Sequence, residues 1–242
     1  LREIAAGIGC SKFTKNIAQR ILKNAKLVFF SPDKGHIKMI KNLKLKNVIP
    51  WKQFVNIDYW LTKKIPNNFS LHIFHPTNLQ WIEDSNGQTL KRNNILFEGF
   101  KIFLENGGHG KLYFLERGQN VIETKNLIKK LDIEDSCFSY GKNLNKSQLK
   151  DAIEKMDVVV DQFHSGDGFG LIALESMSMG KPVMLNTSSN TLRLAYPEPD
   201  ELPPFIISNS PEEVANQLLL LQNINHQNII GSQSRKWIET YH

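Results

Sequence analysis

The sequence predicts an α/β protein whose C-terminal part forms a parallel, doubly wound sheet. Two observations predict this fold class. Short apolar strands alternate with amphipathic helices from Leu71 onward. In addition, the apolar strand at residues 158–160 runs into a glycine-bearing loop, a helix ended by Gly180 and a further apolar strand beginning at Val183. Strands and helices in this order build a parallel sheet that binds ligands at the carboxyl ends of its strands.

The first 64 residues predict a helix, a strand, a second helix and a second strand. The corresponding segments are residues 2–24, 26–30, 33–43 and 47–50. Apolar residues recur at helical spacing in the first segment, and prolines punctuate the strand ends. Residues 51–70 are interpreted as a linker between domains. We therefore expect one domain over residues 1–64 and another over residues 65–242.

The second domain is expected to contain five strands separated by helices. The predicted strands cover residues 71–74, 111–115, 137–140 and 158–160, with the last beginning at Val183. The predicted helices cover residues 93–104, 121–131, 146–155 and the segment between Gly170 and Gly180. Helices of this length between parallel strands are typical of a doubly wound sheet.

The loop that follows residues 158–160 has the character of a ligand site. Its glycines allow the backbone to approach a bulky anionic group, and the N–H groups near Leu171 would face that group with the positive end of a helix dipole. Glu175, one helical turn later, can hydrogen-bond a sugar hydroxyl. At the head of the loop, Asp161 is interpreted either as positioning the loop or as a structural helix cap.

This segment resembles the donor-binding signature of retaining glycosyltransferases of the GT-B fold, family four. The matching residues are Asp167, Gly168-Phe169-Gly170, Glu175 and Gly180-Lys181-Pro182-Val183. Asp167 stands where the family usually carries Glu. The resemblance covers most of residues 65–242 and implies two Rossmann-like lobes, the first of them incomplete. Residues 1–64 would then be the C-terminal part of the acceptor lobe, and residues 65–242 the nucleotide-sugar-binding lobe.

The resemblance also implies catalytic residues. Lys91 matches a family lysine that lies against the diphosphate, while Arg92 replaces the glycine that follows it and is a candidate for a second positive charge. Both would stabilise the charge that develops on the leaving diphosphate. The alternative is that they are two surface cations at a helix start. Glu175 would hold the ribose hydroxyls and Asp167 the sugar hydroxyls.

Further residues are expected to contact the donor. Arg117 is a candidate contact to a phosphate or a base, beside Gly118 in a glycine turn after a strand. The remaining donor contacts are predicted at Gly166, Gly168, Phe169, Gly170 and Leu171. No metal site is expected, because His72 and His75 would face opposite sides of a strand and no Asp-x-Asp signature appears.

The function implied by the resemblance is transfer of a hexose from a UDP- or GDP-sugar to a hydroxyl acceptor, with retention and without a cofactor or metal. The acceptor would be a glycan or a lipid-linked molecule. A non-catalytic nucleotide-sugar-binding module or subunit is the alternative. The sequence lacks an arginine at residues 84–90, where the family carries a catalytic one.

Charge is distributed unevenly along the chain. Residues 1–64 hold 14 Lys and Arg but only three acidic residues, a net charge of +11. Such a region suits an anionic membrane surface, although a solvated basic face without a partner is an equal alternative. Nucleic acid is not an expected partner, since no nucleic-acid-binding motif accompanies the basic residues. Two isolated cysteines and the lack of a long apolar run predict a cytoplasmic protein, peripheral at the inner membrane face in one interpretation.

Overall fold

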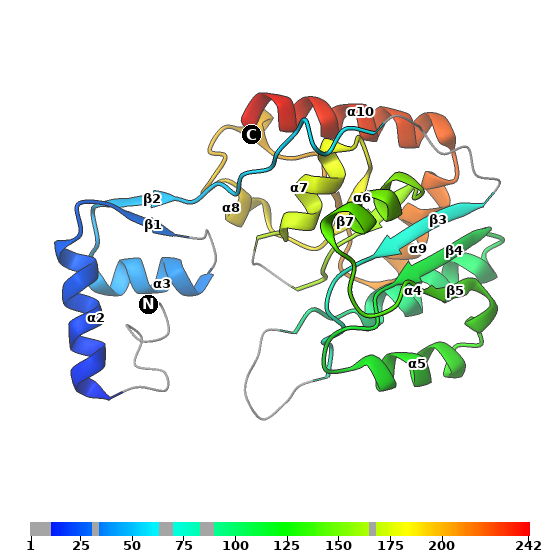
Figure 1. Cartoon of the computed structure of the whole chain (residues 1–242), viewed down its shortest axis with the longest axis horizontal. Coiled ribbons are helices and arrows are strands. Elements are labelled where there is room, and N and C mark those ends of the chain that lie inside the picture. The colour runs from blue at the N-terminus through cyan, green and yellow to red at the C-terminus, as the bar shows by residue number, and fades with distance from the viewer. Residues whose placement is uncertain (1–10, 31–33, 63–69, 83–89, 165–167) are drawn as a thin grey trace. The chain divides into compact units, whose positions relative to one another are not determined.

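The computed structural model describes residues 11–30, 34–62, 70–82, 90–164 and 168–242 (Figure 1). These residues form two compact units. The first contains the described part of Leu1–Gln53 with Gly168 and Ser188–Leu202, and the second contains the described parts of Phe54–Ser165, Phe169–Thr187 and Pro203–His242. No described helix is both long and apolar enough to cross a membrane.

The first unit is built around a two-stranded parallel sheet. Its elements are α2 (Lys12–Asn24), β1 (Val28–Phe30), α3 (Lys34–Leu43), β2 (Val48–Pro50), α8 (Ser189–Leu192) and the 3₁₀ turn η2 (Pro199–Glu201). Ser11 begins α2, because its hydroxyl accepts a hydrogen bond from the Thr14 N–H. A small core of buried residues joins the two longer helices of the unit: Ala18, Leu22, Met39 and Leu45.

The second unit contains a six-stranded sheet in which every neighbouring pair is parallel. Its strands are β3 (Leu71–His75), β4 (Gly110–Phe114), β5 (Cys137–Ser139), β6 (Val158–Val160), β7 (Val183–Leu185) and β8 (Ile206–Ile207). They lie in the order β5-β4-β3-β6-β7-β8. From β3 the chain adds β4 and β5 on one side of the sheet. It then crosses back to β6 and adds β7 and β8 on the other side. This is the doubly wound arrangement that the sequence predicts.

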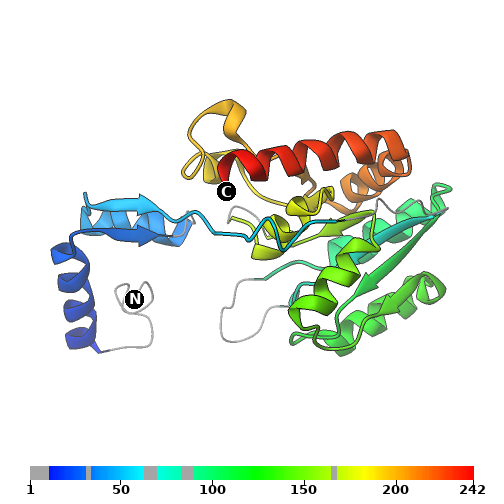
Figure 2. The ribbon, with the colours of Figure 1, turned by 45° about the horizontal axis from the view of Figure 1, so that its top comes forward.

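Helices cover both faces of this sheet (Figures 1 and 2). They are α4 (Asn94–Glu105), α5 (Val121–Lys130), α6 (Lys146–Glu154), α7 (Leu171–Ser178), α9 (Pro211–Leu221) and α10 (Ile224–Tyr241), with the 3₁₀ turn η1 (Glu134–Ser136) before β5. The larger core lies between the sheet and α4, α5 and α9. A second core joins α6 to the opposite face through Phe74 and Val159. The apolar runs of the central strands follow from burial on both faces.

Several element predictions differ from the structure in extent. The segment predicted as a helix over residues 2–24 is helical from Lys12, and residues 2–10 lie outside the described ranges. The first strand begins at Val28 rather than residue 26, because only Val28–Phe30 have partners on β2. The sequence prediction did not include β8 and α9, which follow the prolines at residues 203–204. A two-residue strand carries too little periodicity to be recognised.

The segment interpreted as a linker is partly packed. Trp60 is almost fully buried in the core that includes Phe74 and α6, and Tyr59 packs edge-on against it with ring centroids 5.2 Å apart. The Lys146 ammonium lies 4.4 Å from the centre of the Tyr59 ring. Residues 54–62 therefore belong to the second unit. Burial of a large aromatic side chain explains why this stretch adheres to the sheet domain.

Candidate functional site

The candidate site lies where the winding direction of the second unit reverses. Strands β3 and β6 are neighbours in the sheet, but the chain leaves them on opposite sides, toward β4 and β7. The loops after these strands cannot cover the gap between them, which leaves a crevice at the carboxyl ends.

A pocket of about 290 Å³ occupies this crevice, and we call it the carboxyl-end pocket. It draws residues from the loops after β3, β4 and β6, from the segment before α4, and from α6 and α7. Its lining residues are Pro76, Thr77, Asn78, Lys91, Leu115, Arg117, Leu144, Leu149, Asp161, Gly170, Leu171, Ile172 and Glu175. The structure thus brings together five predicted site residues that lie up to 84 positions apart: Lys91, Arg117, Gly170, Leu171 and Glu175.

Two backbone hydrogen bonds hold Lys91 at the pocket. Its N–H donates to the carbonyl of Gln80 at 2.6 Å, and its own carbonyl accepts from the Phe163 N–H at 3.0 Å. Lys91 is thereby fixed between the loop after β3 and the loop after β6. Burial raises the pKa of Asp161 and lowers that of His75, and the positive charge of Lys91 lowers both pKa values to a smaller extent.

Arg92 lies differently. Its side chain is exposed, and it does not contribute to the described lining of the carboxyl-end pocket. Its φ angle is +51°, the left-handed region that favours glycine. A residue that replaces a family glycine therefore keeps the backbone conformation that glycine prefers. The expectation that Arg92 supplies a second positive charge remains a prediction.

Arg117 supplies a positive charge to the pocket from the loop after β4. One guanidinium nitrogen donates to the Pro76 carbonyl at 2.7 Å, which ties the loops after β3 and β4 together. Gly118 has a φ of +114°, and a Cβ atom there would stand 2.4 Å from the Leu79 carbonyl oxygen. Gly118 therefore allows the close approach of the two loops and does not itself line the pocket.

The glycine-bearing loop is anchored at both ends. Asp161 is buried at the end of β6, and its carboxylate accepts the Gly170 N–H at 2.6 Å. This contact agrees with the interpretation of Asp161 as a cap at the helix start. A Cβ at Gly170 would stand 3.0 Å from that carboxylate, whereas at Gly168 it would meet nothing within 4 Å. The ring of Phe169 packs on Phe205 at 5.0 Å.

Gly166 and Asp167 lie outside the described residues, so their predicted contacts to the donor stay predictions.

Helix α7 brings a carboxylate and backbone N–H groups to the pocket. The N–H groups of Leu171 and Ile172, the first two of α7, have no acceptor within the helix, whereas that of Ala173 donates to the Gly170 carbonyl at 3.0 Å. Glu175 is half-buried one turn further along, and burial raises its pKa to about 7, with Lys146 opposing the rise. A carboxylate and the positive end of a helix dipole thus face the same pocket.

A buried polar network beneath the pocket was missed by the sequence analysis. The His75 Nδ1 lies 2.9 Å from the Val160 carbonyl, and its Nε2 lies 2.7 Å from the Asn93 amide nitrogen. The Asn93 amide also donates to Thr77, which lines the pocket. Burial lowers the pKa of His75 to about 4, so the ring is neutral and Nε2 can accept. The sequence signal that could have indicated this network is the presence of polar residues, His75 and Thr77, at and just after the end of the buried strand β3.

The predicted separation of the two histidines of β3 is confirmed. His75 turns toward Phe97 of α4, with ring centroids 6.4 Å apart. His72 lies on the other face, 5.5 Å from the ring of Tyr113. Within the described ranges, no three His, Cys, Asp or Glu side chains are grouped as a metal site.

Comparison with known proteins identifies a family and several structures of similar fold. Residues 88–237 match the family model described as "Glycosyl transferases group 1". None of the curated proteins matches the chain.

Similar solved structures include S. aureus TarM, in a complex that contains UDP. It superposes with a TM-score of 0.69 at 18% identity, over 97% of this chain and 45% of TarM. Anabaena Alr3699/HepE in complex with UDP gives 0.70 at 15% identity, over 96% of this chain and 64% of that chain. Sucrose-phosphate synthase from Thermosynechococcus elongatus gives 0.69 at 14% identity, over 100% and 61%.

These likenesses define the fold. The chain has the α/β architecture of two Rossmann-like lobes, the GT-B type, as predicted. The first lobe is represented by β1, β2, α2 and α3 among the described residues. The chain spans less than half the length of TarM.

Proposed function

We propose that this chain, which belongs to the glycosyl transferases group 1 family, transfers a hexose from a nucleotide-diphosphate sugar to a hydroxyl acceptor. One observation carries the proposal. Lys91, Arg117, Glu175 and the start of α7 meet in one pocket at the switch point of a parallel sheet. Two cations and a helix N-terminus suit a diphosphate, and a carboxylate suits sugar hydroxyls.

The pocket supports a specific placement of the donor. The diphosphate would lie against Lys91, Arg117 and the first-turn N–H groups of α7. Glu175 would accept hydrogen bonds from the ribose hydroxyls, and the hydroxyls of the transferred sugar would contact Asp167. TarM and Alr3699/HepE both form complexes with UDP, which favours UDP over GDP as the nucleotide here.

The apolar part of the lining suits the nucleobase. Leu115, Leu144 and Leu149 line the same pocket as Arg117 and Glu175. Aliphatic side chains can pack against the faces of a planar ring while backbone groups read its edge.

The chemistry we propose is a front-side displacement. The bond between the anomeric carbon and the diphosphate oxygen breaks while the acceptor oxygen bonds the same face of the sugar, so the configuration is retained. The acceptor proton passes to the departing diphosphate. Lys91 and Arg117 would stabilise the negative charge that grows on the leaving oxygens, and electrostatic stabilisation of this kind needs no metal ion.

Glu175 fits the ribose role only in its ionised form. A carboxylate accepts hydrogen bonds from hydroxyl groups more strongly than a neutral carboxyl group does. Because burial raises the pKa of Glu175 to about 7, donor affinity would increase as the pH rises through neutrality. Lys146, Lys91 and Arg117 are the cations that would favour ionisation, and Asp161 is the acidic group that would oppose it.

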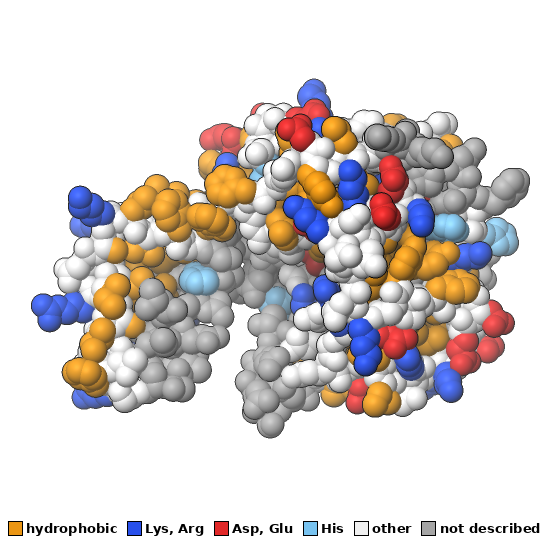
Figure 3. Space-filling view, viewed as in Figure 1, with side chains coloured by type: hydrophobic (Ala, Val, Ile, Leu, Met, Phe, Trp, Pro, Cys, Tyr) orange, Lys and Arg blue, Asp and Glu red, His pale blue; other side chains and the backbone are white. Residues whose placement is uncertain are grey.

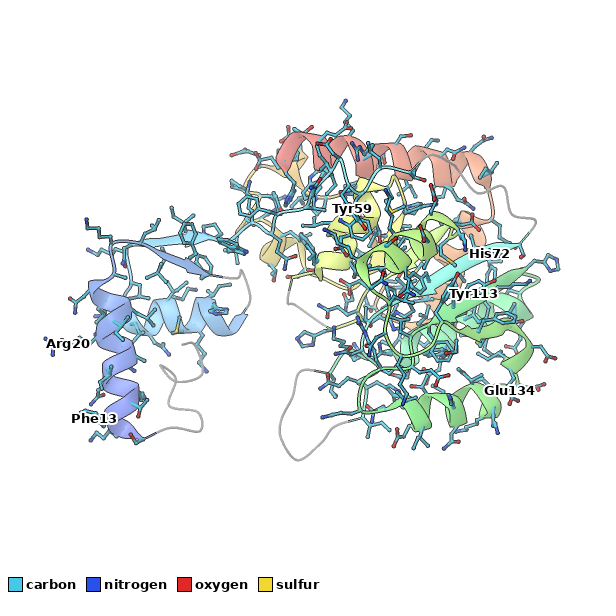
Figure 4. The ribbon with its side chains drawn as sticks, viewed as in Figure 1. Phe13, Arg20, Tyr59, His72, Tyr113 and Glu134 are labelled. Atoms are coloured by element: carbon cyan, nitrogen blue, oxygen red, sulfur yellow. The ribbon has the colours of Figure 1, made fainter. Side chains whose placement is uncertain are left out.

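Contact with an anionic membrane is part of the proposed function, and helix α2 supports it. Phe13, Ile17 and Ile21 lie at successive turns of α2 and are 75%, 44% and 52% exposed. Helix α2 carries four basic residues and no acidic one, and Figure 3 shows basic and hydrophobic side chains together along it. Phe13 and Arg20 project away from α3 (Figure 4). An apolar stripe beside cations is typical of helices that lie on anionic lipid. The location would be the cytoplasmic face of a membrane.

Titration calorimetry with UDP and GDP, followed by a transfer or hydrolysis assay with UDP-glucose, tests the proposal. We expect UDP to bind and UDP-glucose to be turned over. Binding without turnover would support the alternative, a non-catalytic nucleotide-sugar-binding module or subunit. Failure of both nucleotides to bind would contradict either function.

A further inference from the structure

A row of side chains crosses the second unit from its core to its surface. Val159, Phe74, Tyr113 and Phe138 are paired in register across β6, β3, β4 and β5. Val159 and Phe74 are fully buried, Tyr113 is half-buried, and Phe138 is 37% exposed. All four side chains point to the same face of the sheet, because residues in register share a face.

The exposure of this row has a structural cause. Ala152 and Ile153 of α6 pack on the half of the face formed by β3 and β6. Tyr113 of β4 and Tyr140, which follows β5, are only partly buried against this core, and Phe138 of β5 does not belong to it. Helices α4 and α5 belong to the core on the opposite side. The outer half of the face therefore remains accessible.

Aromatic rings cover this accessible half, and we call His72, Tyr113, Phe138 and Tyr140 the aromatic shelf. Tyr113 stacks on Phe138 with centroids 5.4 Å apart and an interplanar angle of 30°. His72 and Tyr140 each lie 5.5 Å from Tyr113. Figure 4 shows His72 and Tyr113 beside each other on β3 and β4, and Figure 3 shows the hydrophobic patch in that region.

The shelf also carries polar groups. The Lys111 ammonium lies 5.7 Å from the centre of the Phe138 ring. Within the described residues, the phenolic oxygens of Tyr113 and Tyr140 have no hydrogen-bond partner, so both can bind a ligand hydroxyl. Lys111 is an exposed cation at the border of the shelf, whereas the Asp157 carboxylate, which accepts the His72 N–H at 2.7 Å, is buried. A flat apolar surface bordered by two phenolic hydroxyls and an ammonium donor suits a hydroxyl-rich ligand without charge of its own.

We propose that the aromatic shelf binds a neutral carbohydrate chain, outside the donor pocket. The C–H groups on one face of a hexose ring carry partial positive charge and match the negative face of an aromatic ring. The hydroxyls at the edge of the hexose are then placed against Tyr113, Tyr140 and Lys111.

The size of the shelf favours such a ligand over a protein partner. An aromatic side chain has about 150–250 Å² of surface; Phe138 is 37% exposed and the other three rings are less exposed, so the four together offer at most roughly 300 Å². A stable protein interface needs about 800 Å² from each partner. A few sugar rings match the smaller area.

The shelf ends close to the carboxyl-end pocket in the chain. Tyr140 directly follows β5, and the next residue, Gly141, accepts a hydrogen bond from the Glu116 N–H through its carbonyl. Leu144, three residues later, lines the pocket. A carbohydrate held on the shelf would therefore be retained on the donor lobe while the reaction site remains open.

Saturation-transfer NMR and calorimetry with cellohexaose and maltohexaose, two neutral glucose oligomers, test the proposal. We expect at least one of them to bind, and Phe138→Ala and Tyr113→Ala each to weaken it by about tenfold, the effect of losing one aromatic contact. Phe138→Tyr keeps the ring and should retain binding. Ile122→Ala removes a 72% exposed side chain of α5 and is the matched surface control.

UDP titration of each variant separates this site from the donor pocket and shows that the lobe is folded. Absence of binding by both oligomers, up to their solubility limits, would overturn the proposal, and so would an unchanged affinity in Phe138→Ala with UDP binding intact. Self-association of the wild-type chain that Phe138→Ala abolishes would assign the shelf to a protein interface instead.

Discussion

Two cavities lie at opposite ends of the strands of the same parallel sheet, and the larger of the two is not the candidate site. The second cavity, of about 340 Å³, lies beside the amino ends of β6 and β7, and we call it the amino-end cavity. Its lining residues are Thr62, Met156, Asp157, Met179, Gly180, Lys181, Pro182, Gln227, Asn228, Gly231, Ser232, Arg235, Lys236 and Glu239. Both cavities contain lysine, arginine and acidic side chains.

The two cavities differ in what their charged groups contact. In the amino-end cavity, the buried Lys181 ammonium donates to the carbonyls of Glu154 and Met156 at 3.0 and 2.7 Å. Arg235 donates to the Ser178 carbonyl at 2.6 Å and pairs with Glu239 at 2.7 Å. These cations complete the hydrogen bonding of backbone groups between elements. Their role is structural.

In the carboxyl-end pocket, by contrast, no described residue forms a hydrogen bond or ion pair with the Lys91 ammonium or the Glu175 carboxylate. Arg117 and Asp161 of the same pocket do bond backbone groups, those of Pro76 and Gly170, so the contrast rests on Lys91 and Glu175. Charged groups without protein partners in a concave site are available to a ligand. The hydrogen bonding of the charged groups, rather than the volume of the cavity, therefore distinguishes a site for ligands from a gap between packed elements.

The largest expected effect is that of Lys91→Ala. Turnover of UDP-glucose should fall by about 100–1,000-fold, as for other groups that stabilise charge only in the transition state. The dissociation constant for UDP should rise by much less. Steady-state kinetics and calorimetry measure the two effects. Equal losses of turnover and affinity would make Lys91 a docking cation and weaken the contrast between the cavities.

Glu175→Ala should weaken UDP binding by about 10- to 100-fold, because a hydrogen bond to a charged group contributes about 1.5–3 kcal/mol. The wild type should bind UDP more tightly as the pH rises through about 7, whereas Glu175→Gln should lose this pH dependence. Calorimetry across pH 5 to 9 measures both. An unchanged affinity in Glu175→Ala would remove this residue from the ribose role.

The free energy of unfolding should depend on pH in the direction opposite to UDP affinity. The pKa of Glu175 is raised from 4.5 to about 7 in the folded state, so its contribution to stability is present below 4.5 and is lost as the pH rises through 7. Glu175→Gln should therefore be relatively more stable than the wild type above pH 7. Thermal unfolding at pH 5 and pH 8 measures the difference, and a wild-type-like dependence on pH would contradict it.

Lys181→Met tests the structural role assigned to the cations of the amino-end cavity. It leaves two backbone carbonyls without their donor, which should lower the free energy of unfolding by about 1–3 kcal/mol. UDP affinity and turnover should stay at wild-type values. Urea denaturation gives the first quantity, and calorimetry with UDP gives the second. A loss of UDP affinity at full stability would indicate that the amino-end cavity also binds ligand.

The smallest expected effect is that of Arg92→Gly. Relief of the left-handed backbone should raise the free energy of unfolding by about 0.5–1 kcal/mol, while turnover should change by no more than about twofold. Arg117→Ala, which removes a pocket cation, should reduce turnover more. A turnover loss in Arg92→Gly as large as that of Lys91→Ala would establish Arg92 as the second positive charge.

Much of the fold was predictable because the evidence for it is local. Residues 158–160 were predicted as a strand with the bounds that the structure has, since three consecutive valines between polar residues leave no other placement. Gly180 was predicted to stop α7, and its φ of +65° agrees. β8 and α9 were missed, because a short strand after prolines has no repeated pattern.

The candidate site was predictable in part. Lys91, Arg117, Gly170, Leu171 and Glu175 were each named from the sequence, and the structure places all five around one pocket. Arg92 was given a role like that of Lys91, yet adjacent residues point in different directions, and it is exposed. The His75 and Asn93 network was not predicted, because these residues are 18 positions apart and meet only after β3 and α4 pack.

By itself, the sequence determined the alternation of strands and helices, the glycine-bearing loop and the residue types that suit a nucleotide sugar, because periodicity and turn chemistry act over a few neighbouring residues. Folding of the whole domain settles which of those residues share a pocket, which glycine lets two loops approach each other, and which lysine donates its hydrogen bonds to backbone carbonyls. The physical reason is that strand order joins loops far apart in the chain, and burial then sets the charge and the partners of each side chain.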